Sequence, residues 1–113
     1  MKFKTDKVVL TLCATCDGAD NTVLQSRLAT EDFAAPVELR RQDCMNGCAR
    51  PVTLALQGHG RATCFFAGVD PAGDAEDIVS TLHSYIAAPA GWIEDARPCG
   101  RLRFCLMGRV PAF

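Results

Sequence analysis

The chain has 113 residues, the size of one domain, and 49% of them are hydrophobic, which is enough for a single core. Its net charge of −1 gives no general attraction to nucleic acid or to anionic lipid. No apolar stretch approaches the ~18 residues of a membrane helix, and the N-terminus shows no signal-peptide core. We therefore expect a cytoplasmic protein that binds neither nucleic acid nor membranes.

The first part of the chain alternates between strand and helix patterns. Residues 7–12 (KVVLTL) are rich in β-branched side chains and predict a buried strand. Residues 22–29 predict a helix with capping-box spacing at its start, and Pro36 ends it. Residues 37–41 (VELRR) alternate between apolar and polar and predict a short strand.

The second part predicts a hairpin, a long helix and an irregular tail. Residues 52–57 (VTLALQ) and 61–67 (RATCFFA) flank a Gly-rich turn, as in a β-hairpin. Residues 73–87 show one apolar face at helical spacing, with acidic residues in the first turns. Residues 89–113 are rich in Pro and Gly, with one further short strand expected at 102–107.

The predicted order is therefore β-α-β-β-β-α followed by an extension. A right-handed crossover makes the first two strands parallel, and the hairpin adds antiparallel strands. This predicts an α/β fold, a thioredoxin-like mixed sheet, over residues 1–88. We expect residues 89–113 to form an irregular C-terminal extension packed on the same domain.

Four of the seven cysteines form two close pairs, each after the end of a predicted strand: Cys13 with Cys16, and Cys44 with Cys48. In the cytoplasm, cysteines are more often thiols, metal ligands or catalytic groups than a disulfide framework. Loops at the same edge of neighbouring strands can meet, and four thiolates can hold tetrahedral Zn or an iron–sulfur cluster. The spacing alone leaves both metals open.

Both cysteine segments resemble a known family. DCMNGCARPVTLAL (residues 43–56) is similar to the second ligand loop of thioredoxin-like 2Fe–2S ferredoxins, with Gly before the second Cys and Pro before a strand. LTLCATCDG (residues 10–18) is similar to the first loop, although those ferredoxins space the two cysteines more widely. Over about residues 7–88 the chain resembles small bacterial proteins described as predicted metal-binding proteins of that type.

The resemblance implies a function and a ligand set. It implies that Cys13, Cys16, Cys44 and Cys48 ligate one 2Fe–2S cluster. The chain would then be a ferredoxin-like one-electron carrier and not an enzyme. The resemblance further implies a redox partner protein and allows a homodimer.

Two other functions remain open. Cys13 and Cys16 lie between the first strand and the first helix, where a thioredoxin keeps its redox pair, so a thiol–disulfide oxidoreductase is one alternative. That reading leaves Cys44 and Cys48 unused, and the helix starts several residues after Cys16. A Zn-stabilised interaction module is the other alternative.

The remaining polar and sulfur side chains have ordinary explanations. Cys64 sits in a strand pattern and is expected in the core, whereas Cys99 and Cys105 are expected to be free thiols of the extension. We expect His59 and His83 on the solvated surface. The acidic residues expected to cap the long helix or to favour its dipole are Asp70, Asp74, Glu76 and Asp77. Three arginines flank the second cysteine loop, and they either form a docking patch for an acidic redox partner, tune the potential of the cluster or are plain solvated surface: Arg40, Arg41 and Arg50.

Overall fold

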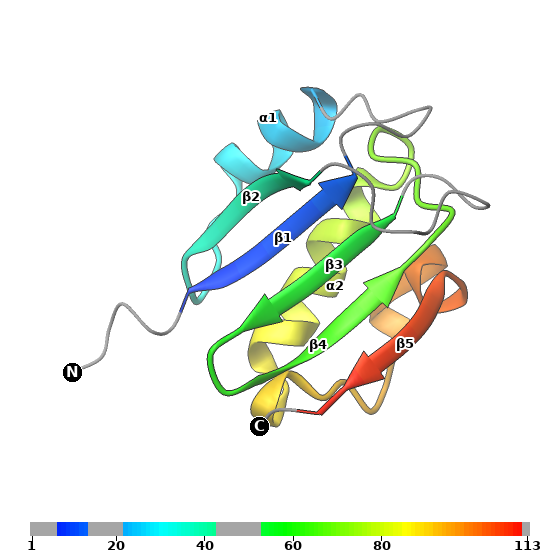
Figure 1. The fold of residues 1–113 in the computed structure, drawn as a ribbon. Helices are drawn as coiled ribbons and strands as arrows, with labels where there is room; N and C mark the ends of the chain where they lie inside the picture. The colour runs from blue at the N-terminus through cyan, green and yellow to red at the C-terminus, as the bar shows by residue number, and fades with distance from the viewer. Residues whose placement is uncertain (1–6, 14–21, 43–52, 112–113) are drawn as a thin grey trace.

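The computed structural model describes residues 7–13, 22–42 and 53–111, and it builds them into one mixed sheet with helices (Figure 1). The elements in chain order are β1 (Val8–Cys13), α1 (Thr22–Thr30), β2 (Val37–Gln42), β3 (Leu54–Gly58), β4 (Arg61–Phe66), α2 (Ala75–Ala87), the 3₁₀ segments η2 (Pro89–Gly91) and η3 (Arg97–Phe104), and β5 (Leu106–Val110). The β-α-β-β-β-α order expected from the sequence is confirmed.

Among the described residues, the sheet has five strands in the order β2-β1-β3-β4-β5. Strands β1 and β2 are parallel, as the crossover through α1 requires. Every other neighbouring pair is antiparallel, including the β3–β4 hairpin. The fold class is therefore a small α/β domain with a mixed sheet.

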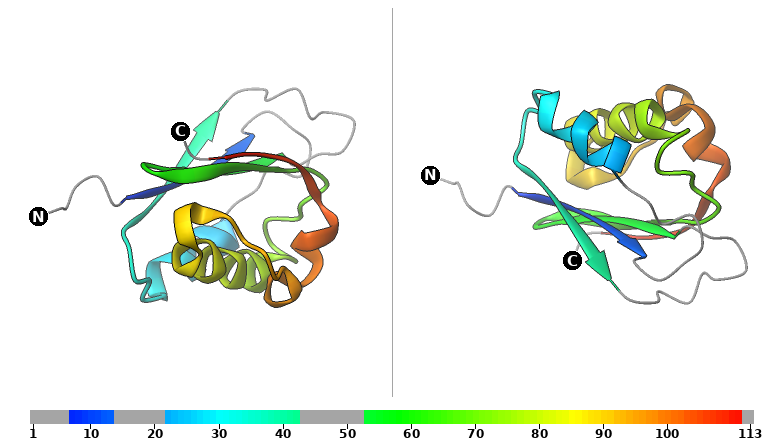
Figure 2. Two further views of the ribbon diagram at one scale, coloured as in Figure 1. Left: turned by 90° about the horizontal axis from the view of Figure 1, so that it is seen from below. Right: turned by 90° about the horizontal axis from the view of Figure 1, so that it is seen from above.

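Both helices cover the same face of the sheet (Figure 2). Alternate strand residues point to that face, so Leu10 and Leu56 are at most 1% exposed and pack in the core. From α2, Ile78, Leu82 and Tyr85 lie at i, i+4 and i+7 and are also at most 1% exposed. Burial of this stripe against the strands holds the two layers together.

The C-terminal extension differs from the expected pattern. The strand predicted at residues 102–107 is wrong in its bounds, because η3 continues to Phe104 and β5 spans Leu106–Val110. Leu102 is fully buried in η3, which packs against α2. β5 pairs with β4 and becomes the outer strand of the sheet.

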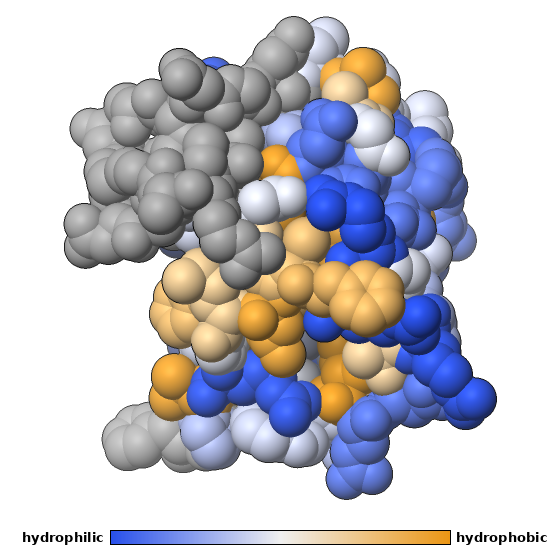
Figure 3. Space-filling model, turned by 90° about the vertical axis from the view of Figure 1, so that its right-hand side faces the viewer, coloured by the Kyte–Doolittle hydropathy of each residue, from blue (hydrophilic) through white to orange (hydrophobic). Residues whose placement is uncertain are grey.

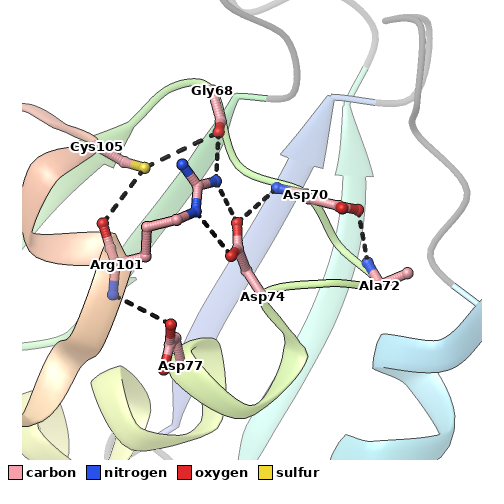
Figure 4. A network of polar contacts seen from close by, with 7 residues as sticks. All are labelled: Gly68, Asp70, Ala72, Asp74, Asp77, Arg101 and Cys105. Atoms are coloured by element: carbon pink, nitrogen blue, oxygen red, sulfur yellow. Dashed lines mark hydrogen bonds and ion pairs between the residues drawn. The ribbon is translucent and has the colours of Figure 1, made fainter.

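One arginine ties this extension to the start of α2 (Figure 4). The Arg101 guanidinium donates to both oxygens of Asp74, with Nε 2.8 Å from Oδ1, and to the Gly68 carbonyl at 2.7 Å. The backbone N–H of Arg101 donates to the Asp77 carboxylate at 3.1 Å. The backbone N–H of Asp70 donates to Asp74 at 2.8 Å.

This network corrects the expectation that the Asp74 side chain caps α2, whereas Glu76 and Asp77 lie in the first turn of α2 as expected. Asp74 occupies the position before α2, yet its side chain makes no cap hydrogen bond to the first turn. Its carboxylate instead accepts hydrogen bonds from Arg101, and this contact lowers the pKa of Asp74. Glu76 makes an ion pair with Arg27 of α1 at 2.6 Å. Asp74, Asp77 and Glu76 therefore join elements distant in sequence.

Apolar side chains gather on the outside of the sheet where β5 lies (Figure 3). The large exposed apolar residues of β4, η3 and β5 are Phe65, Phe104, Leu106, Met107 and Val110. Within the described residues, no helix is long and apolar enough to cross a membrane.

Candidate functional site

The strand ends next to both cysteine segments meet at one edge of the sheet (Figure 1). Cys13 is the last residue of β1 and pairs with Gln42, the last residue of β2. On the other side of β1, Leu12 pairs with Leu54, the first residue of β3. We call this edge, defined by Cys13, Gln42, Thr53 and Leu54, the cysteine edge. At this edge, the chain continues from β1 into residues 14–21 and from β2 into residues 43–52.

Only part of the predicted ligand set can be located. The backbone of Cys13 is placed in β1, whereas Cys16, Cys44 and Cys48 lie outside the described residues. In the ranges 7–13, 22–42 and 53–111, no three His, Cys, Asp or Glu side chains gather as metal ligands. Because three of the four predicted ligands fall in the gaps, this leaves the prediction untested.

Thr53 is the unusual residue at the cysteine edge. It is 3% exposed, and its Oγ1 has no hydrogen-bond partner among the described residues. Buried hydroxyls nearly always have a partner, as Thr81 does in donating to the Asp77 carbonyl at 2.7 Å. Nothing in the spacing of the sequence singled out Thr53, because the pattern VTLALQ predicted only a strand.

The cysteine edge is apolar on the helix side. Leu12 and Leu54 are each 1% exposed there. The end of β4 lies farther along the same edge, since Leu54 also pairs with Phe66. The Ala67 N–H donates to the Cys105 carbonyl at 2.9 Å, which brings the start of β5 to this edge as well.

The three cysteines outside the predicted ligand set carry free thiols, and all three are buried: Cys64, Cys99 and Cys105. Burial raises the pKa of the Cys64 thiol, although Arg109 partly opposes this, so Cys64 stays neutral near pH 7. Cys64 and Cys99 line a small apolar cavity of about 50 Å³. The core placement of Cys64 is confirmed, as are free thiols at Cys99 and Cys105.

The two histidines, His59 and His83, differ in the contacts that they make. His59 lies in the exposed β3–β4 turn, as expected. His83 is exposed on α2, as expected, and it also makes contacts: its Nε2 is 2.5 Å from Glu31 Oε2, and its ring centroid lies 4.8 Å from that of Phe33. The Glu31 side chain is only 24% exposed, so this contact joins the end of α1 to α2.

Of the three arginines expected near the second cysteine loop, two are described. Arg40 is engaged within β2, because its Nε lies 2.6 Å from Glu38 Oε2. This contact, with a second from Lys7, lowers the pKa of Glu38 to about 2. Arg41 is exposed, and Arg50 lies outside the described residues. A docking role for these arginines stays a prediction.

Comparison with known proteins identifies the family but no activity. No curated protein and no solved structure matches this chain. A family model described as "Protein of unknown function (DUF1636)" matches residues 10–112, which includes the cysteine edge and the C-terminal extension. The chain therefore belongs to the DUF1636 family.

Proposed function

We propose that this protein binds one 2Fe–2S cluster through Cys13, Cys16, Cys44 and Cys48 and serves as a ferredoxin-like one-electron carrier, not as an enzyme. The observation that carries the proposal is the cysteine edge, where both cysteine segments join the sheet side by side.

Chain connectivity limits how far the two cysteine pairs can lie from the cysteine edge. Neighbouring strands lie about 4.8 Å apart, so Cys13 and Gln42 are adjacent across the β1–β2 ladder. Cys44 is only two residues after Gln42, which is at most ~7 Å of extended chain. Cys48 precedes Thr53 by five residues, so the second segment leaves and rejoins the sheet on either side of Cys13.

The sheet topology also supports a thioredoxin-like fold, which we propose for residues 1–88. Its features are the parallel β1–β2 pair, the antiparallel β3–β4 hairpin placed beside β1, and helices packed on one face. In this view, β5 is an added outer strand from the C-terminal extension.

The residues at the cysteine edge suit an iron–sulfur group. Four thiolates are soft ligands of the kind that bind such clusters. Leu12 and Leu54 are buried there and would exclude water, and the Thr53 hydroxyl is a buried hydrogen-bond donor without a described acceptor. When bound, the cluster supplies reversible one-electron chemistry. The chain's own residues hold it and set the polarity around it.

The cysteine count argues against a thiol–disulfide oxidoreductase. Such an enzyme needs one reactive cysteine pair. With Cys13 and Cys16 in that role, Cys44 and Cys48 would have none. A Zn-stabilised module shares the thiolate set, so metal content must separate it from the proposed carrier.

The experiment that tests the proposal is anaerobic purification followed by visible spectroscopy of the wild type and two matched variants. We expect a brown wild type, a bleached Cys44→Ala variant and a Cys64→Ala variant that keeps the wild-type spectrum. A wild type that stays colourless after reconstitution with iron and sulfide would refute the proposal. Zinc analysis and a disulfide-reduction assay would then distinguish the two alternatives. Loss of colour in Cys64→Ala alone would show that the ligand set is wrong.

The partner proposals follow from the same function. We propose that the protein transfers its electron to or from a redox partner protein. We also propose a homodimer, which light scattering would detect by its mass. A monomeric mass at all accessible concentrations would exclude the homodimer, and the cluster proposal would still stand.

A further inference from the structure

Two buried thiols outside the proposed cluster site share one small cavity. Cys64 of β4 and Cys99 of η3 both line it, where the C-terminal extension lies against the sheet. Cys64 is 2% exposed and Cys99 is 4% exposed, and both are free thiols. A buried free cysteine ordinarily packs as a small hydrophobic side chain. Here two of them border a space that the described side chains leave unfilled.

The size of the cavity limits what it can hold. Its volume of about 50 Å³ exceeds the ~10–15 Å³ that one water-sized sphere occupies. It is far below the ~300 Å³ of the smallest usual ligand pockets. The cavity therefore has room for a single ion or a few atoms, and not for an organic substrate.

The surroundings of the cavity suit a pair of negatively charged thiolates. Arg103 and Arg109 line it together with the two cysteines. The Arg109 guanidinium lies 3.9 Å from the centre of the Trp92 ring and donates to a main-chain carbonyl of the extension at 2.8 Å. These contacts hold a positive charge beside the thiols. The rest of the lining is apolar, which keeps water from a metal–sulfur bond.

The number and kind of ligands select the ion. Thiolates are soft ligands, which favour Cu(I), Zn²⁺ and iron–sulfur clusters. Structural Zn²⁺ takes four ligands, and in the described part of the chain no third His, Cys, Asp or Glu side chain completes a metal site. Cu(I) is satisfied by two thiolates. The resulting complex carries one negative charge, which the neighbouring arginines can balance.

We propose that Cys64 and Cys99 bind one Cu(I) ion between them. On binding, each S–H group loses its proton to the solvent and two Cu–S bonds form, with no change in oxidation state. The site shares no ligand with the proposed cluster and does not depend on it.

The test counts the copper bound per chain of the full-length, metal-free, reduced protein. Cu(I) is added without oxygen, in competition with the chelator bathocuproine disulfonate. Other cysteines of the chain also compete for Cu(I), so the informative quantity is the difference between variants. We expect Cys64→Ala, Cys99→Ala and the double variant each to bind one ion fewer than the wild type, because the two thiols share one ion.

Cys105→Ala is the matched control and should keep the wild-type count. Cys105 is 1% exposed, but its thiol is directed at main-chain carbonyls, with Sγ 3.6 Å from the Arg101 oxygen and 3.9 Å from the Gly68 oxygen (Figure 4). Loss of an ion in this variant as well would mean that any buried thiol of the chain binds Cu(I), and would overturn the proposed site.

Three further outcomes decide the proposal. Wild-type counts in both single variants, or a loss in only one of them, would overturn it. A double variant that loses two ions would also overturn it, since each thiol would then bind its own ion. If circular dichroism shows that the alanine variants do not fold, Cys64→Val and Cys99→Val give the same comparison.

The melting temperature supplies a second measurement. An ion that binds only the folded chain stabilises it, so Cu(I) should raise the Tm of the wild type more than that of the double variant. Equal increases would contradict the site. The iron and sulfide content of the protein is measured separately, so failure here leaves the cluster proposal standing.

Discussion

Replacing Asp74 with Asn should loosen the C-terminal extension from the rest of the domain. The Asp74 side chain is 8% exposed and accepts two hydrogen bonds from the Arg101 guanidinium and one from the backbone N–H of Asp70 (Figure 4). An Asn side chain keeps one acceptor but turns an NH₂ group toward the guanidinium. Arg101 lies within η3 and β5 follows directly after it, so the loss reaches the outer strand of the sheet.

Asp74→Asn should lower the free energy of unfolding by about the contribution of one charge-assisted hydrogen bond. Hydrogen bonds to charged groups contribute about 1.5–3 kcal/mol each. The Arg101 side chain is 49% exposed and can turn to water, so we expect a loss of about 2 kcal/mol and not the larger cost of stranding a buried charge. With an unfolding entropy of about 2.1 cal/mol/K per residue, this lowers Tm by about 8 °C.

A double-mutant cycle provides the assay. Asp74→Asn, Arg101→Gln and the double variant are unfolded in urea, and the coupling free energy is taken from the four stabilities. We expect a coupling of about 1–2 kcal/mol. A coupling below about 0.3 kcal/mol would show that the two side chains do not interact in solution, and would refute the reasoning.

The pH dependence gives an independent check of the same contact. Arg101 holds the pKa of Asp74 below its usual range, so the unfolded chain binds this proton at a higher pH than the folded protein does. The stabilisation is complete above the unfolded pKa of about 3.9 and is lost as pH falls through the lower folded pKa. Wild-type stability should therefore fall more steeply than that of Asp74→Asn as pH drops below about 4. Parallel curves would contradict the assignment.

Three further substitutions test the packing of the extension and its surroundings by urea unfolding. Leu102→Ala should cost about 2–5 kcal/mol, because the side chain is fully buried; a loss under about 1 kcal/mol would place Leu102 outside the core. Tyr85→Phe should cost about 1 kcal/mol, because the buried hydroxyl donates to a main-chain carbonyl of β4; an unchanged stability would show that this bond contributes nothing. Gly91→Ala should destabilise more than the control Gly60→Ala, since both have positive φ but only at Gly91 would the new Cβ lie 2.8 Å from Arg61 Cβ. Equal losses would mean that backbone strain alone accounts for both.

The order of the first six elements could be predicted because each leaves a local signal. The β-branched run of β1 and the apolar stripe of α2 are visible within a dozen residues of sequence. The extension could not be predicted in the same way. η3 depends on the contact of Arg101 with Asp74, 27 residues earlier, and β5 depends on pairing with β4. Tertiary contacts of this kind override the weak strand propensity at residues 102–107.

The sequence predicted that the two cysteine segments join the sheet at one edge, whereas the ligand set itself stays a prediction. Two cysteine segments after neighbouring strands indicated a shared edge, and the register of Cys13 with Gln42 agrees with that location. Thr53 could not be recognised, because the lack of a partner for a hydroxyl is a property of the folded chain. Asp74 was assigned to a helix cap, since its binding to Arg101 is likewise visible only in three dimensions.

The most direct test of the central claim is the iron and acid-labile sulfide content of the anaerobically purified wild type. The four-cysteine proposal predicts about two irons and about two sulfides per chain, with both lost together in Cys44→Ala. Zinc in place of iron, or a metal-free protein that takes up neither iron nor sulfide on reconstitution, would contradict it.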